Sequence, residues 1–281
     1  MRLCRIISFL LLPCLFLTAC RSREQEREAL LEIICLDVGQ GTSVLLRTRE
    51  GDVLVDAGSE DSQSALCYRL KELGVSQLRC LILTHFDLDH IGGADAVLRE
   101  FSVDAVWVGE SASENEASAR FWDAAKVCAL SPLRVYAGAQ LILDEAVITV
   151  LAPSLNDDAK NEDGVILTVR CGACSFLMMG DADARAERAL VETYGEAQLR
   201  ADLLLVSHHG SNDGSDLTFL NAVKPSAAII SCGAGNPYGH PDGRTIAKLL
   251  EVGAEIYRTD LMGDIRFCID DEGYRLCECV S

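Results

Sequence analysis

The chain has 281 residues, of which 49% are hydrophobic, and a formal net charge of −18 at pH 7. This length and composition allow one large or two small domains with a substantial core, and they exclude a disordered chain. The negative charge disfavours tight, non-specific binding to nucleic acid, because contacts with the phosphate backbone normally rely on a basic surface.

The first twenty residues have the pattern of an export signal. Arg2 and Arg5 precede the apolar run 6–17, and Leu17-Thr18-Ala19-Cys20 follows. A transmembrane helix needs about 20 residues, more than this run has, and a small residue precedes the cysteine. The segment resembles a bacterial lipoprotein signal. The alternatives are a plain membrane anchor and a secretory signal that is cut elsewhere.

This resemblance implies that residues 1–19 are removed and that a lipidated Cys20 holds the mature protein at the outer face of the cell membrane. Because the removed segment carries two arginines and no acid, its loss takes the formal charge from −18 to −20. A linker is expected over residues 20–31, and a single domain over residues 32–281.

The domain begins with three predicted strands, at residues 33–36, 44–47 and 53–55, which form a β-meander. A helix is predicted at 63–73 and a buried strand at 80–83. The predicted order of strand, helix, strand and helix implies helices packed on the outer face of a sheet.

The turn after the strand at 80–83 carries four ionisable side chains within six residues, those of His85, Asp87, Asp89 and His90. Without a cation between them, these groups would repel or desolvate one another. The alternative is a solvated acidic turn with incidental histidines. We favour a divalent metal, because all five histidines of the chain lie in only three loops.

The stretch Thr84-His85-Phe86-Asp87-Leu88-Asp89-His90 resembles the H-x-H-x-D-H signature of the metallo-β-lactamase-fold hydrolases, with Asp87 in place of the second histidine. The same departure is typical of the ComEC-type competence proteins and their stand-alone relatives. The resemblance extends from about Glu32 to Arg275. It implies an α/β fold in the form of a four-layer αββα sandwich.

Two further loops complete the pattern. Gly180-Asp181 follows the predicted strand 175–179; the alternative for Asp181 is an ordinary helix N-cap. Ser207-His208-His209-Gly210-Ser211 follows the strand 202–206, and spacing alone leaves open which histidine would bind a metal. His240 lies in the loop 233–241, and we expect Pro241 in the first turn of the next helix.

The family resemblance implies specific roles for these residues. One metal would be held by His85, Asp87 and Asp181, and the other by Asp89, His90 and His208, with Asp181 shared. His240 is the candidate general acid, His209 the candidate clamp on a substrate oxygen, and Asp89 a further catalytic candidate. Supporting or substrate-contacting positions would be Asp37, Gln40, Asp56, Ser211 and Asn236.

These expectations point to a hydrolase with two divalent ions, manganese or zinc, that holds a hydroxide in line with a phosphorus atom. A phosphodiester, which could be DNA, is the expected substrate, and the protein is expected to be a monomer. Segments 84–93, 207–215 and 233–241 contain no Lys or Arg, which favours a small diester over a long polyanion. The alternatives are a lactam or thioester hydrolase and a lipid-anchored binding module with a vestigial metal site.

Ten cysteines follow Cys20. In an exported protein this number suggests disulfides, but Cys35, Cys80 and Cys268 lie in apolar strands, where a free thiol behaves as a small hydrophobe. Cys171 and Cys174 flank a predicted hairpin turn. A redox or zinc pair there is the less favoured interpretation, because no second pair at ribbon spacing accompanies it.

Overall fold

The computed structural model describes residues 29–109, 114–152 and 164–277. The expected export signal and Cys20 lie outside these residues. Among the helices in the described ranges, none has the length and apolar character needed to cross a membrane.

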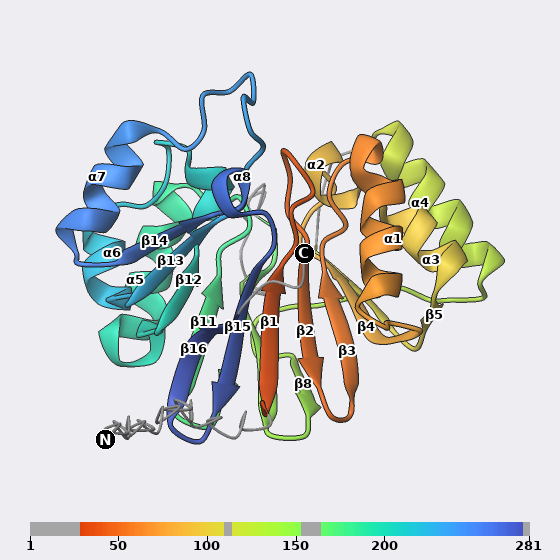
Figure 1. Cartoon of the computed structure of the whole chain (residues 1–281), viewed down its shortest axis with the longest axis horizontal. Helices are drawn as coiled ribbons and strands as arrows, with labels where there is room; N and C mark the ends of the chain where they lie inside the picture. Colours follow the sequence, from red (N-terminus) through yellow and green to blue (C-terminus); the bar gives the residue numbers. More distant parts are fainter. Residues whose placement is uncertain (1–28, 110–113, 153–163, 278–281) are drawn as a thin grey trace, which may run out of the picture.

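Two sheets face each other across the molecule (Figure 1). The first has the order β16-β15-β1-β2-β3-β4-β6-β7, with β5 paired to β4. Its strands are β1 (Leu31–Cys35), β2 (Val44–Thr48), β3 (Gly51–Val55), β4 (Gln77–Leu83), β5 (Ser102–Val103), β6 (Val106–Val108), β7 (Leu133–Arg134), β15 (Ile265–Asp270) and β16 (Gly273–Cys277).

The second sheet has the order β14-β13-β12-β11-β10-β9-β8. Its strands are β8 (Gln140–Leu143), β9 (Ala146–Ala152), β10 (Ile166–Cys171), β11 (Cys174–Met178), β12 (Leu203–Leu205), β13 (Ala227–Ile230) and β14 (Glu255–Arg258). The chain therefore completes most of one sheet before it builds the other, and the C-terminal hairpin β15–β16 returns to the first.

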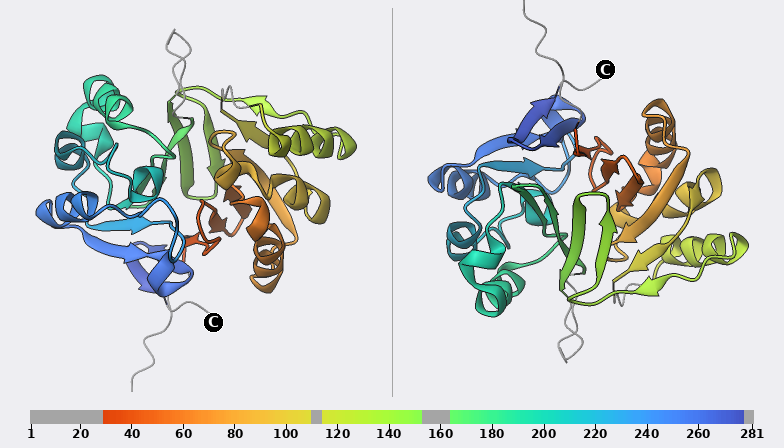
Figure 2. Two further views of the ribbon diagram at one scale, coloured as in Figure 1. Left: turned by 90° about the horizontal axis from the view of Figure 1, so that it is seen from above. Right: turned by 90° about the horizontal axis from the view of Figure 1, so that it is seen from below.

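Helices cover the outer face of each sheet, as Figure 2 shows from two further sides. The first sheet carries α1 (Gln63–Glu72), α3 (Ala94–Glu100) and α4 (Glu116–Val127), and the second carries α5 (Ala184–Leu199), α6 (Leu217–Val223) and α7 (Gly243–Glu251). Shorter helical turns are η1 (Glu60–Ser62), α2 (Leu88–Ile91), η2 (Ser207–Gly210) and α8 (Thr259–Met262).

Three buried clusters hold these layers together. The largest lies between the two sheets and includes Ile33, Phe176 and Phe267. A second, around Phe121, fills the space between the first sheet and its helices, and a third, around Phe219, does the same for the second sheet. Two inner sheets with helices on both outer faces make the αββα sandwich that the sequence predicts.

Parallel strands in both sheets end at one edge of the sandwich. β3, β4 and β6 run parallel in the first sheet, and β11 to β14 run parallel in the second. The loops that follow β4, β11, β12 and β13 meet at the top in Figure 1. Carboxyl ends of parallel strands are where open α/β sheets place their ligands.

The structure corrects three local expectations. The metal-loop turn contains the short helix α2, because Asp87 adopts extended backbone and begins it. Helix α7 has Asp242 as its N-cap, so Pro241 lies before the helix and not in its first turn. Cys268 forms a disulfide with Cys277 that joins β15 to β16, whereas Cys35 and Cys80 remain buried thiols.

Candidate metal centre

The loop between β4 and α3 presents the first set of candidate ligands. Close backbone packing fixes it: a Cβ on Gly92 would lie 2.3 Å from the Glu60 amide nitrogen, and one on Gly93 would lie 2.5 Å from the Ala57 carbonyl oxygen. Both positions therefore require glycine. These two glycines, which lie just after the signature stretch, allow the loop to pack closely against the turn that follows β3.

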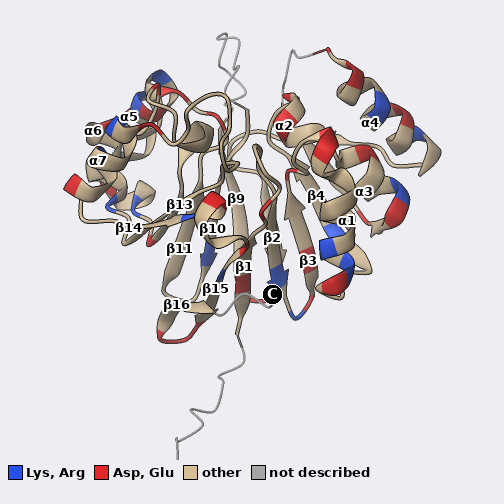
Figure 3. Cartoon of the chain, turned by 45° about the horizontal axis from the view of Figure 1, so that its top comes forward, with Lys and Arg blue, Asp and Glu red and all other residues tan. Residues whose placement is uncertain are grey.

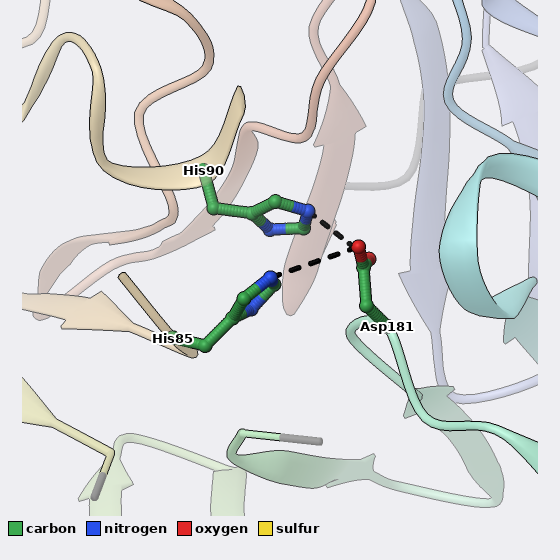
Figure 4. Close-up of side chains that lie close together, drawn as sticks. All are labelled: His85, His90 and Asp181. Carbon is green, nitrogen blue, oxygen red and sulfur yellow. Dashed lines mark ion pairs between the residues drawn. The ribbon is translucent and has the colours of Figure 1, made fainter. Parts of the chain in front are cut away.

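His85, His90 and Asp181 form the first compact group of ligand atoms (Figure 4). The Nε2 atoms of His85 and His90 lie 3.6 Å and 3.1 Å from the two carboxylate oxygens of Asp181. Asp181 comes from the loop after β11, in the other half of the chain. The two sheets thus each contribute to one cluster.

Asp56 lies behind His90 and orients it. Its Oδ2 lies 2.7 Å from His90 Nδ1 and accepts a hydrogen bond from the Thr84 hydroxyl, while Oδ1 accepts the Thr84 amide. The Asp56 side chain is completely buried. A carboxylate on the remote nitrogen of a ligating histidine fixes the ring orientation and leaves Nε2 for a metal.

Asp181 is separate from the cap of the following helix. Asp183 is the N-cap of α5, where its side chain accepts the amides of Arg185 and Ala186. The alternative reading of Asp181 as an N-cap is therefore excluded. Its carboxylate is directed at the histidine cluster instead.

Asp89, His90 and His209 form the second group. His209 Nε2 lies 3.1 Å from Asp89 Oδ2, and His209 Nδ1 donates to the Ser231 carbonyl. The His209 ring is buried. His209 thus occupies the position in the second group that we expected for His208.

His208 lies on the other side of Asp181. Its Nε2 is 3.7 Å from Asp181 Oδ2, the oxygen nearest His85, and its Nδ1 lies 2.9 Å from Asp213 Oδ2. Both His208 (φ 48°) and His209 (φ 53°) have left-handed backbone, which turns their rings to different sides. The expectation for His208 came from the family resemblance, and spacing alone had left the choice between the two histidines open.

Asp87 borders the first group from the exposed side. Its Oδ2 lies 3.8 Å from His85 Nε2, and its side chain is 56% exposed. Asp87 and His208 thus adjoin the pair of His85 and Asp181, whereas Asp89 and His209 adjoin His90.

Buried ligand atoms without hydrogen bonds test whether the cluster fits metal ions. Within the described part of the chain, His85 Nε2, His90 Nε2, His209 Nε2 and Asp181 Oδ1 are all buried and make no hydrogen bond. Buried polar atoms are otherwise almost always paired. Four such atoms converging on one place are the donors that divalent transition metals prefer, and the residues fit two ions.

The electrostatics of the cluster also favour cations. Burial alone would lower the pKa of His90, but the carboxylates of Asp181 and Asp56 outweigh it and raise this pKa well above its usual value. Burial alone would raise the pKa of Asp181, yet the charge on His90 holds it well below its usual value. The site therefore attracts positive charge, which a metal ion supplies as readily as a proton.

His240 completes the arrangement from the loop after β13. Its ring centroid lies 5.7 Å from that of His208 and 6.4 Å from that of His209. Burial and the two neighbouring histidines lower its pKa. Asn236 fixes the loop, since its Oδ1 accepts the amides of Tyr238 and His240 and its Nδ2 donates to the His240 carbonyl.

The remaining expected positions support loops and do not reach the cluster themselves. Gln40 Oε1 accepts the Gly233 amide, and exposed Asp37 accepts the Gly39 amide. The Ser211 carbonyl accepts the Thr245 hydroxyl, which ties the His208–His209 turn to α7.

Three supporting residues were missed in the sequence. Thr84 contacts both Asp56 and His85, Asp213 holds His208, and the Ser231 carbonyl holds His209. Thr84 and Asp213 adjoin the two histidine motifs and could have been considered on that ground. Ser231 acts through its backbone, which no sequence pattern reveals.

The comparison with protein families settles the fold family. The profile of the metallo-beta-lactamase superfamily matches residues 36–234. The chain belongs to this superfamily. Its candidate metal centre lies within or next to the matched segment, and the hydrolases of this superfamily are mostly metal-dependent.

The similar curated proteins place the chain in the competence-related group of the superfamily. It is 29% identical to ComE operon protein 3 of Bacillus subtilis over 94% of this chain and 35% of that protein. It is 32% identical to competence protein ComA of Neisseria gonorrhoeae over 85% of this chain and 32% of that protein. The chain thus spans about a third of the length of these relatives.

Solved structures agree on the fold. The E377D mutant of the β-hydroxylase CmlA has a TM-score of 0.56 at 16% identity, over 86% of this chain and 55% of that one. The metallo-beta-lactamase fold protein YhfI of Bacillus subtilis has a TM-score of 0.53 at 12% identity, over 81% and 96%. A diphosphatase of the PhnP family has a TM-score of 0.50 at 14% identity, over 81% and 94%.

Proposed function

We propose that this protein is a phosphodiesterase that works with two divalent metal ions. The observation that carries the proposal is the pair of ligand groups that meet at His90, one with His85 and Asp181 and the other with Asp89 and His209, whose buried nitrogen and oxygen atoms include several without hydrogen bonds. His85, Asp87, Asp181 and His208 would hold one ion. Asp89, His90, His209 and Asp181 would hold the other.

When bound, two such ions neutralise phosphate oxygens and lower the pKa of water. The protein residues orient the metal ligands and supply a proton to the departing oxygen. Asp56 and the Ser231 carbonyl orient His90 and His209, and Asp213 orients His208. The His240 ring lies beside both histidines of the η2 turn, and we assign to it the donation of a proton to the departing oxygen.

The competence-related relatives make DNA the second candidate substrate. About two thirds of each relative lies outside the matched region. The function of the whole relative is therefore not assigned to this chain. Figure 3 shows Lys and Arg mainly on the outer helices and the lower strands, away from the loops at the site. A small or single-stranded diester would be repelled less than duplex DNA.

Hydrolysis of bis(p-nitrophenyl) phosphate tests the proposal. The purified protein would be stripped with chelator and reconstituted with manganese, zinc or magnesium. Asp181→Asn should abolish turnover. Asp202→Asn is the matched control, because that carboxylate accepts the Ser175 amide at the other end of the parallel strands, away from the metal ligands. Metal-independent turnover, or none with any ion, would contradict the proposal.

A salt series separates the two substrates. Turnover of single-stranded DNA that far exceeds small-diester hydrolysis and falls steeply with salt would favour a nuclease. Hydrolysis of lactams or thioesters in place of diesters would favour that alternative, and tight metal binding without any turnover would favour a binding module. We further propose export and anchoring through a lipidated Cys20.

A further inference from the structure

A groove opens directly onto the second ligand group. It has a volume of about 750 Å³ and is lined by residues of segments 37–40, 59–65, 88–89 and 234–238. Asp89 belongs both to this groove and to the ligand group with His209. Whatever occupies the groove therefore lies next to the reacting phosphate of a bound diester.

Two large apolar side chains stand exposed on its walls. Leu88 on α2 is 58% exposed, and Tyr238 in the loop after β13 is 68% exposed. Tyr238 is not held by core packing. Its loop is fixed by Asn236, which accepts the Tyr238 amide. An exposed aromatic ring on a fixed loop beside a catalytic centre is suited to contact a ligand.

Tyr238 ends a series of nearly parallel rings. Its ring lies 5.7 Å from that of His240 at an interplanar angle of 27°, and His240 lies 6.4 Å from His209 at 25°. The series runs from the surface to the ligand group of Asp89. A flat ring bound in the groove could extend it by stacking on the open face of Tyr238.

The charges of the groove limit the kind of ligand that can carry this flat ring. Asp37, Asp61 and Asp89 are the charged residues among the described lining, which includes no Lys or Arg. A second phosphate group would be repelled here, whereas an uncharged base would not. Ser59, Ser62 and Gln40 offer polar contacts to the edge of a base. Bases stacked in a duplex cannot present a free face to Tyr238.

We infer that the groove binds a nucleobase attached to the scissile phosphodiester, with Tyr238 as its stacking platform. This inference rests on the proposed phosphodiesterase function and adds a residue that determines specificity. Stacking of a base on an aromatic side chain is sequence-tolerant, so we expect little preference among bases.

Two diesters of equal charge and leaving group test it. Thymidine 5′-(p-nitrophenyl phosphate) carries a base, and methyl p-nitrophenyl phosphate does not. We expect kcat/KM to favour the thymidine ester about tenfold, the factor for about 1.4 kcal/mol of stacking. Tyr238→Ala should bring the ratio toward one, and Tyr238→Trp should retain it. Tyr68→Ala, which removes an equally exposed ring on α1, should change neither value.

An unchanged ratio in Tyr238→Ala would overturn the inference. Saturation-transfer NMR with thymidine, an uncharged nucleoside, distinguishes failure of the groove assignment from failure of the proposed phosphodiesterase function. If the protein hydrolyses neither ester but the thymidine signal depends on Tyr238, the proposed function fails and the groove assignment stands. If both esters are hydrolysed and thymidine gives no Tyr238-dependent signal, the groove assignment fails.

Discussion

His209 Nε2 lies 3.1 Å from the Asp89 carboxylate, whereas Nε2 of the adjacent His208 lies 3.7 Å from Asp181 Oδ2. The sequence has no histidine between His90 and His208. Consecutive histidines with left-handed backbone offer one imidazole to each side. We therefore assign His209 to the second ion and His208 to the first.

The assignment predicts different losses for the two histidines. His209→Ala should leave one manganese ion per chain instead of two and lower turnover at least about 100-fold, since it removes a direct ligand. His208→Ala should weaken the first ion and leave the second bound. Elemental analysis after gel filtration measures both. Loss of the second ion in His208→Ala, with His209→Ala unaffected, would restore the assignment made from the sequence.

Asp56 should act on metal affinity through His90. Asp56→Asn replaces a buried carboxylate that faces His90 Nδ1, and changes of this kind typically lower metal affinity about 10- to 100-fold. Isothermal titration of the stripped protein with manganese measures the effect. Asp202→Asn, which breaks a comparable contact to Ser175, should alter thermal stability without altering manganese affinity. Equal affinities in all three proteins would exclude the supporting role.

Asp87 should set the metal preference. An oxygen ligand in place of the usual imidazole favours manganese or magnesium over zinc. We expect manganese to activate the wild-type protein and Asp87→His to shift the preference toward zinc, measured by competitive binding of the two ions. Tightly bound zinc in the wild-type protein, with activity indifferent to added manganese, would contradict this prediction.

Glu187 should make stability depend on pH. Its buried carboxylate accepts the amides of Ser215 and Asp216, yet burial outweighs these bonds and the nearby Lys248, and Asp216 adds repulsion, so its pKa rises from 4.5 to about 7. Between these values the unfolded chain has lost the proton that the folded chain keeps. Stability therefore falls as the pH rises through this window, by at most about 3 kcal/mol.

Urea denaturation of the wild-type protein and Glu187→Gln at pH 4.5 and pH 7.5 isolates this contribution. The variant does not titrate at this position, so the wild type should lose stability relative to it as the pH rises. A constant difference at the two pH values would show that folding does not shift the pKa of Glu187.

Cys20 should be the mature N-terminus. Ala19 and the preceding apolar run are the features on which the prediction rests. Mass spectrometry of the protein isolated from membranes should find a diacylated Cys20, and any other N-terminal residue would disprove the lipoprotein assignment.

Local sequence patterns predicted the sandwich well because its strands are short apolar runs that end in polar turns, as Leu83 is followed by Thr84 and His85. Site residues from distant segments could be predicted where their local motif is unusual, as for Asp181 at the end of an apolar strand and for the adjacent His208 and His209. Backbone geometry was not predictable in the same way. The left-handed φ of His208 and His209, which decides their directions, arises from packing of the η2 turn against Ser231 and α7.

The two halves of the chain have a further connection at the edge of the sandwich. His85, Asp87, Asp89 and His90 come from the first sheet, whereas Asp181, His208 and His209 come from the second. Bound ions would therefore cross-link the sheets without a covalent bond. Because the unfolded chain does not bring these ligands together, ion binding adds to folding stability by mass action, about 2.7 kcal/mol for each site at a free ion concentration of 100 Kd. Chelators should then lower the melting temperature of the whole molecule, and the organism's metal supply would control how long the protein persists.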